Sequence, residues 1–189
     1  MLRRLLQEHA QLLREVTELR LLRDHAYHDP LTGLRNTRYL QIRLNEELQR
    51  GGPLGAGAGS LVLLDIDGMG RLNQRHGRAA GDSALRWLSR QLTATVRVSD
   101  VCCRTGADRF TLILPDTDRD GAETTVIRIG QAVGAARGES WMPLNFSRGL
   151  ATWPKDGRDS RELIRSAARS LEDDQRRHRA SGARLRLVP

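Results

Sequence analysis

Two apolar runs separated by a tight turn constrain the fold of this chain more than any other stretch. Val101–Arg104 and Arg109–Leu114 have the residue types of β-strands, and Thr105–Asp108 between them predicts a hairpin turn. A third run, at 61–67, is almost continuously apolar before it ends in acid, which is typical of a central strand buried on both faces. These segments predict a sheet, and the hairpin places the carboxylate of Asp108 at its tip.

Helical patterns alternate with strand patterns along the rest of the chain. Gly51–Ser60 is expected to be a flexible loop, and Leu144–Trp153 a strand with Gly149 inside it. Arg184–Val188 alternates and predicts an edge strand, and Asn36 is a candidate helix cap. Apolar helical stripes are formed by Leu40, Leu44 and Leu48, by Leu85, Leu88 and Leu92, by Val126, Ile129 and Val133, and by Leu163, Ile164, Ala167 and Leu171. The predicted class is α/β or α+β, with a central sheet covered by helices.

The N-terminal residues carry the pattern of a long helix that precedes the sheet. Apolar or small residues recur there in a 3-4 rhythm, which favours a parallel two-stranded coiled coil that pairs two copies of the chain. The alternative is an amphipathic helix packed on its own domain. His28–Leu34 contains a proline and a glycine and ends this helix, so the sequence divides into a signalling helix at 1–28 and a domain at 29–189. The seam consists of Leu2, Leu5, Leu12, Val16, Leu19 and Ala26, interrupted by His9 and Arg23.

The composition restricts the partners and the location of the chain. A formal net charge of +8 and a pI near 10.9 suit a phosphate-bearing partner, although an arginine-rich coding bias gives the same balance. Aromatic residues make up only 4% of the chain, so nucleic-acid binding by base stacking is not expected. Cys102 and Cys103 are adjacent in a strand and cannot readily bridge, which predicts core residues in a reducing compartment. No stretch approaches the roughly 20 apolar residues of a membrane helix, and we expect the chain in the cytoplasm.

Two carboxylates fall at strand ends that should be neighbours. Asp65 lies near the end of the run at 61–67 and Asp108 lies in the hairpin turn, so pairing of these strands would bring them to one edge of the sheet. Paired carboxylates commonly hold Mg²⁺ for phosphoryl or nucleotidyl transfer. The alternative is that both are ordinary turn and capping residues.

Several separated motifs, in the same order, resemble the GGDEF family of diguanylate cyclases. They are Asp29–Asn36, then Asp65–Asp67 followed by Asn73 and Gly81–Asp82, then Arg104–Phe110. The resemblance implies a central, mostly antiparallel sheet flanked by helices and related to the palm of nucleotide cyclases. It also implies that two GTP molecules are joined into cyclic di-GMP across a dimer.

The same resemblance implies which groups form the nucleotide site. Asp65, Asp108 and the backbone of Ile66 match the metal ligands of the family. Asn73 and Asp82 match the pair that hydrogen-bonds the guanine base, for which an amide and a carboxylate are suited.

The signature of the hairpin departs from the family pattern and reads Gly106–Phe110, GADRF. Its second glycine is Ala107, whose methyl group crowds the approach of the phosphates. Its glutamate is Arg109, and a cation at this place competes with Mg²⁺. The binding of Mg²⁺ is therefore in doubt, and chemistry is expected to be lost while nucleotide binding can survive.

Two further departures remove the phosphate-binding lysines. Gly70 stands where the family has the lysine that follows the first strand. The lysine of the last helix falls on Gln175, or on Arg179 when the alignment runs backward from Gly182. Both changes agree with lost catalysis.

A second site is implied by an arginine and an aspartate three residues apart, just upstream of the hairpin. Arg97 and Asp100 fall in the register of the family's inhibitory product site, and Arg128 lies where a further arginine often completes it. Guanidinium groups can donate to guanine O6 and N7, a carboxylate can accept from its N1 and N2 hydrogens, and arginine neutralises phosphate. The alternative is an exposed ion pair between Arg97 and Asp100.

These observations favour a catalytically degenerate GGDEF domain that binds cyclic di-GMP at the second site. It would signal as a homodimer to an output protein that the sequence does not identify. Three alternatives stay open: a weakly active diguanylate cyclase, a dimerisation or protein-interaction domain that binds no nucleotide, and a GTP sensor that uses the retained positions of the first site.

Overall fold

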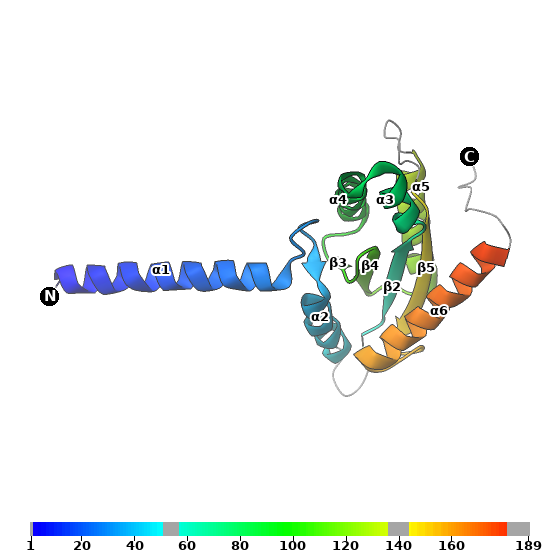
Figure 1. The fold of residues 1–189 in the computed structure, drawn as a ribbon. Coiled ribbons are helices and arrows are strands. Elements are labelled where there is room, and N and C mark those ends of the chain that lie inside the picture. Colours follow the sequence, from blue (N-terminus) through cyan, green and yellow to red (C-terminus); the bar gives the residue numbers. More distant parts are fainter. Residues whose placement is uncertain (1, 51–56, 136–143, 181–189) are drawn as a thin grey trace.

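The computed structural model describes residues 2–50, 57–135 and 144–180. In this part of the chain a long helix, α1 (Leu2–Tyr27), extends away from a domain that contains a sheet and the other helices (Figure 1). These helices are α2 (Thr37–Gln49), α3 (Met69–His76), α4 (Arg78–Thr95), α5 (Arg119–Ala135) and α6 (Ser160–Ala180). The strands are β1 (Arg35–Asn36), β2 (Gly59–Ile66), β3 (Val101–Arg104), β4 (Arg109–Pro115) and β5 (Phe146–Trp153).

The strands form one five-stranded sheet in the order β1-β3-β4-β2-β5. β1 runs parallel to β3, and the other pairs are antiparallel. The predicted hairpin is β3 and β4, so the predicted fold class, a mostly antiparallel sheet flanked by helices, is confirmed. Because β2 and β4 are antiparallel neighbours, the C-terminal end of β2 lies beside the hairpin turn.

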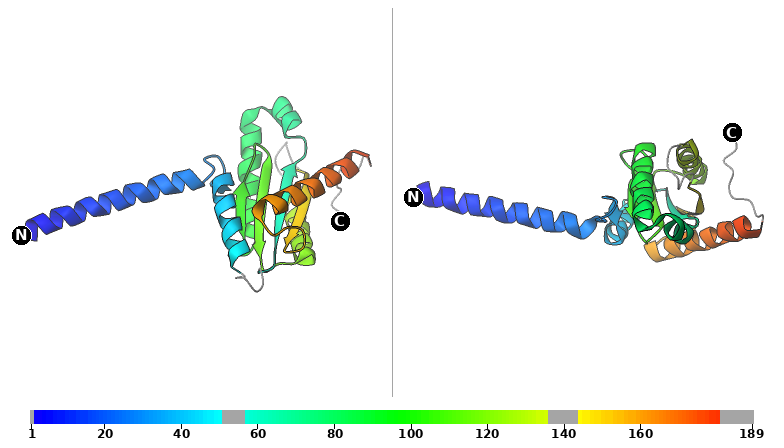
Figure 2. Two further views of the ribbon diagram at one scale, coloured as in Figure 1. Left: turned by 90° about the horizontal axis from the view of Figure 1, so that it is seen from below. Right: turned by 45° about the horizontal axis from the view of Figure 1, so that its top comes forward.

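Side chains of β2 alternate between two apolar layers. Val62 and Leu64 share a core with residues of α4 and α5, whereas Leu61 and Leu63 share a second core with residues of α2 and α6. Figure 2 shows the sheet between these two layers of helices. The continuous apolar run of β2 therefore reflects burial on both faces, as the sequence predicts.

The packing of α6 on β5 depends on a glycine. A Cβ atom on Gly149 would lie 2.1 Å from the carbonyl oxygen of Ala167 and 2.7 Å from Cβ of Leu171. Only a residue without a side chain allows the helix to approach the strand so closely.

We therefore expect Gly149→Ala to lower the free energy of unfolding by about 1–3 kcal/mol, the usual cost of overpacking a core. Gly70→Ala is the matched control, because a Cβ atom there meets nothing within 4 Å and the residue lies in a helix. It should be neutral or stabilising by about 0.5–1 kcal/mol. Urea denaturation of both variants measures the difference, and equal effects would contradict this account of the α6 contact.

Asn36 holds the junction between α1 and the domain. Its Oδ1 accepts from the backbone N–H of Tyr39 (3.2 Å), so it caps α2 as the sequence predicts. Its Nδ2 donates to the carbonyl oxygen of Ala26 (2.8 Å) in the last turn of α1. One side chain thus joins the end of α1 to the start of α2.

Pairing of two copies through α1 and the domain division at residue 28 stay predictions. Leu12 and Val16 of the expected seam are 59% and 42% exposed, on a helix that points away from the sheet (Figure 1). The side chains of Leu2, Leu5, Leu19 and Arg23 lie outside the described residues. Among the described helices, none has the length and apolar character needed to cross a bilayer.

The structure corrects the predicted loop at 51–60 in part. Gly59 and Ser60 belong to β2, because they pair with β4 and β5 and the Ser60 hydroxyl donates to the carbonyl oxygen of Thr117 (2.7 Å). Residues 51–56 and the predicted edge strand at 184–188 lie outside the described residues. α3 and β1 are elements that the sequence patterns did not predict.

The adjacent cysteines are both free, as expected of core residues. Burial raises the pKa of the Cys102 thiol and of the Cys103 thiol to about 12. Both thiols therefore stay protonated, and so unreactive, at neutral pH.

Candidate functional site

β2 and the hairpin bring the two predicted carboxylates to one edge of the sheet. The backbone N–H of Ile66 donates to the carbonyl oxygen of Asp108 (3.0 Å), and Asp65 lies directly opposite Arg109 in the β2–β4 register. Asp65, Ile66 and Asp108 are therefore close neighbours, which is the juxtaposition that the strand pattern predicts.

A guanidinium group already neutralises one of these carboxylates. Nη2 of Arg109 lies 2.9 Å from Oδ2 of Asp65, and the two side chains are 46% and 14% exposed. A cation at this distance repels a divalent ion, so this arrangement of the two side chains does not fit Mg²⁺ at Asp65. Within the described ranges, no group of three or more His, Cys, Asp and Glu side chains is placed to hold a metal ion.

Asn73 and Asp82, the predicted guanine pair, come from the consecutive helices α3 and α4. Oδ1 of Asn73 is buried without a hydrogen-bond partner, and it lies 1.9 Å from the place that a Cβ atom on Gly81 would occupy. Gly81 thus makes room for the amide, and Asp82 follows it directly. A buried acceptor left unpaired costs about 1–3 kcal/mol, which a donor from a ligand or a water would recover.

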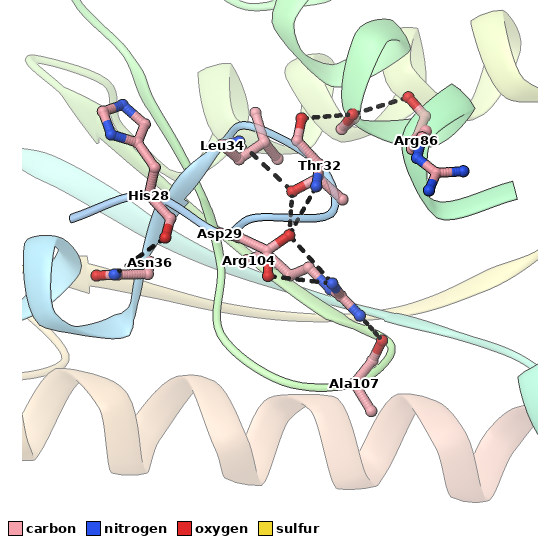
Figure 3. Close-up of polar contacts among 9 residues, drawn as sticks. His28, Asp29, Thr32, Leu34, Asn36, Arg86, Arg104 and Ala107 are labelled. Carbon is pink, nitrogen blue, oxygen red and sulfur yellow. Dashed lines mark hydrogen bonds and ion pairs between the residues drawn. The ribbon is translucent and has the colours of Figure 1, made fainter. Parts of the chain in front are cut away.

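An ion pair ties the hairpin to the turn that follows α1 (Figure 3). Nη1 of Arg104 lies 3.0 and 3.1 Å from the two carboxylate oxygens of Asp29, and its Nη2 donates to the carbonyl oxygen of Ala107 (2.7 Å). Asp29 also accepts from the backbone N–H and the hydroxyl of Thr32, at 2.8 and 2.6 Å. Burial alone would raise the pKa of Asp29, but the hydrogen bonds from Thr32 and the pairing with Arg104 hold it below its ordinary value of 3.8.

α6 contributes a histidine that sequence reasoning missed. The Ser147 hydroxyl donates to Oδ1 of Asp67 (2.9 Å), which uses its only hydrogen, so it accepts from Nδ1 of His178 at 3.2 Å. Of the two predicted positions, Gln175 is half-buried but not basic, and Arg179 is basic but exposed. His178 is therefore the basic side chain that α6 brings to the edge of the sheet at Asp67. The sequence signal that could have identified His178 was the length of the helix. α6 continues to Ala180, which keeps position 178 on its inward face.

The loop between α4 and β3 orders Arg97 and Asp100 through the backbone. Oδ2 of Asp100 accepts from the backbone N–H of Arg97 (2.8 Å), and the N–H of Asp100 donates to the carbonyl oxygen of Arg97 (3.1 Å). Among the ion pairs of the described residues, none joins the two side chains, so the simple surface pair is not formed. Arg97 instead lines an open pocket of about 430 Å³ with Ala58, Asp116, Thr117, Asp118 and Gly121.

Arg128 reaches the same region from α5. Its Nη2 donates to the carbonyl oxygen of Thr95, the last residue of α4. A cation at the C-terminal end of a helix is favoured by the helix dipole. Because Arg97 follows Thr95 by two residues, α5 brings the third predicted residue to the start of the Arg97–Asp100 loop.

This fold, with its signature hairpin beside the end of β2, defines a domain of the nucleotide-cyclase type. The sequence matches the family model described as "Diguanylate cyclase, GGDEF domain" over residues 26–181. The chain belongs to the GGDEF family.

Individual relatives agree with this assignment. The chain is 32% identical over 147 residues to the response regulator PleD of Caulobacter vibrioides, a match that covers 75% of this chain and 32% of that protein. The chain therefore spans about a third of the length of this relative.

Solved structures show the same fold. The coiled coil and GGDEF domain of DgcB from Caulobacter crescentus, in complex with cyclic di-GMP, has a TM-score of 0.82 at 23% identity, covering 92% of this chain and 93% of that one. A microbial GGDEF domain described for its interaction with cyclic di-GMP has a TM-score of 0.71 at 27% identity, covering 86% and 96%.

Proposed function

We propose that this chain is a GGDEF domain without cyclase activity that binds cyclic di-GMP through Arg97, Asp100 and Arg128. The observation that carries the proposal is the state of the Arg97–Asp100 loop. Asp100 fixes the backbone of Arg97 and leaves the guanidinium without an ion pair to that carboxylate, and Arg97 is one of the residues that line an open pocket. An arginine held in place but not neutralised by its neighbour is suited to a phosphate or a guanine edge.

The first site supports the loss of catalysis. Phosphoryl and nucleotidyl transfer depend on cations that neutralise the charge developing on the reacting phosphate. Here the carboxylate of Asp65 is paired with Arg109, a side chain of the protein itself. The site that would hold the reacting phosphate thus already contains a cation, and that cation is the side chain of Arg109 in the hairpin.

The relatives supply the class of ligand. A microbial GGDEF domain at 27% identity is described for its interaction with cyclic di-GMP, and the same ligand is proposed for this chain. α1 is proposed to pair two copies through the face that carries Leu12 and Val16, which would place two such sites in one assembly.

Calorimetric titration of cyclic di-GMP into the full chain tests the proposal. Wild type should bind, and Arg97→Ala should bind about tenfold to a hundredfold more weakly, because a bidentate arginine–guanine contact is worth about 1–3 kcal/mol. Arg128→Ala should weaken binding in the same direction.

Arg90→Ala is the matched control, since Arg90 is an exposed arginine of α4 outside the proposed site. It should bind as wild type does. Heat that is absent in wild type would remove the effector function and favour a domain that binds no nucleotide. An equal affinity in wild type and Arg97→Ala would refute a site at Arg97.

A further inference from the structure

We propose that the outer face of α3 and α4 is a docking surface for an anionic lipid bilayer. The two helices lie side by side and pack on the face of the sheet that also carries α5 (Figure 1). Together they contain five arginines and a single acidic residue, so their net charge of +4 is half of the formal +8 of the whole chain. The arginines are all exposed, and together they are called the arginine face: Arg71, Arg75, Arg78, Arg86 and Arg90.

The arginine face is not neutralised by the protein itself. Among the ion pairs of the described residues, none involves an arginine of α3 or α4, whereas each of the other described helices pairs at least one arginine with a carboxylate. Asp82 lies one helical turn from Arg78 and from Arg86 and forms an ion pair with neither. An arginine-rich coding bias explains arginines on every helix, but it does not explain why carboxylates are scarce on these two.

The side chains around the arginines favour a phosphate-bearing surface over a protein partner. On the outer face of α4 these side chains are small, because Ala79, Ser83, Thr93 and Ala94 are exposed there. None of the exposed large apolar side chains of the described residues lies in α3 or α4, so the face lacks the apolar anchors that dominate binding between proteins. A guanidinium, in contrast, can donate two parallel hydrogen bonds to a phosphate.

A bilayer fits this face better than a nucleic acid does. Base stacking requires exposed aromatic side chains, and Trp87, the one aromatic residue of the two helices, is half-buried against the core. The phosphates of a bilayer form an extended surface that arginines reach without contacts to bases. Basic side chains on a helix are attracted to such a surface by its negative potential alone.

Co-sedimentation of the full chain with lipid vesicles tests the proposal. Vesicles of phosphatidylglycerol and phosphatidylcholine in equal parts should carry the protein into the pellet at low salt, and vesicles of phosphatidylcholine alone should not. Added NaCl should release the protein, because salt screens the attraction. Sedimentation with both kinds of vesicle, or with neither, would overturn the proposal.

Two double variants of equal charge separate the arginine face from the net charge of the chain. Arg86→Ala with Arg90→Ala should lower the vesicle partition coefficient about thirtyfold, because each basic residue near an anionic surface is worth about a factor of five. Arg161→Ala with Arg165→Ala is the matched control, since these exposed arginines are also one turn apart and lie on α6, which covers the opposite face of the sheet. The control should lose at most about twofold, because charges farther from the bilayer than the Debye length are screened. Equal losses in the two variants would refute a docking face on α3 and α4.

The same double variant separates this surface from the effector function. Arg86→Ala with Arg90→Ala should bind cyclic di-GMP as wild type does, because neither residue lines the pocket beside Arg97. A loss of cyclic di-GMP affinity in this variant would refute a separate surface. Binding of wild type to a short DNA duplex, but not to the anionic vesicles, would assign the face to nucleic acid instead. Thermal melts of each variant exclude unfolding as the cause of a lost signal.

Discussion

Arg104→Ala should lower the free energy of unfolding by about 1–3 kcal/mol, because the half-buried ion pair that it breaks lies between the exposed and the buried case. Asp29 and Arg104 are 18% and 13% exposed, and Asp29 would keep its charge without its guanidinium partner. The carbonyl oxygen of Ala107 in the hairpin turn would lose a donor as well. The substitution therefore affects both the turn after α1 and the hairpin.

Urea denaturation of a double-mutant cycle with Asp29→Ala measures the coupling between the two side chains. The matched control is Arg109→Ala, which removes a more exposed pair and should cost at most about 1 kcal/mol. A loss in Arg104→Ala no larger than in this control would show that the link to Asp29 does not stabilise the fold.

The difference in the free energy of unfolding between wild type and Arg104→Ala should depend on pH in the acid range. The pKa of Asp29 is lowered in the folded chain, so its contribution is fully present above the ordinary, unfolded value of 3.8 and is lost as pH falls through the folded value. The stability gap between wild type and Arg104→Ala should be full at neutral pH and should shrink below about pH 4. A gap that stays constant into strong acid would contradict the ion pair as its source.

Incubated with GTP and magnesium, the chain should form no more cyclic di-GMP than its Asp108→Ala variant. Removing one preorganised electrostatic contact from an active site typically costs about 10²–10³ in kcat. Here four positions differ at once, because Gly70, Ala107, Arg109 and the last-helix position at Gln175 or Arg179 stand where the family pattern has other residues. The combined loss should leave product below detection by chromatography.

A cyclase of known activity, assayed in parallel, establishes that the conditions support the reaction. The decisive comparison is between wild type and Asp108→Ala, since this carboxylate is needed only if the site is catalytic. Product that forms in wild type and disappears in Asp108→Ala would restore the weakly active cyclase as the function of the chain.

The main elements of the fold could be predicted because each buries a recognisable pattern. The run of β2 is apolar on both faces and the hairpin has apolar strands around a glycine-containing turn. These segments lie where the sequence places them, except that β2 begins two residues earlier, at Gly59. α3 was missed because it has 8 residues with only Met69 buried, and it starts after Gly68 without a side-chain cap. β1 has two residues, which is too short for any periodicity.

The candidate site could be predicted less completely, because its decisive contacts depend on register. The sequence predicts a cation near the carboxylates, but only the β2–β4 register identifies Asp65 as the partner of Arg109. The spacing of Arg97 and Asp100 suggests a side-chain pair, yet in a loop the backbone N–H competes for the carboxylate and takes it. The prediction of His178 depended on where α6 ends. The alignment of the last helix was ambiguous, so the sequence did not decide this point.

Because α1 is anchored at one end, at Asn36, a small rotation at the junction moves its free end through a large distance. The 26 residues of α1 span about 39 Å at a rise of 1.5 Å per residue. A tilt of about 10° at the junction would therefore carry the free end through about 7 Å, by the length of the helix alone. The near end is fastened to Asn36, a few residues from the Asp29–Arg104 link to the hairpin. A displacement at that link too small to disturb the core would therefore move the far end of α1 by more than the length of one helical turn.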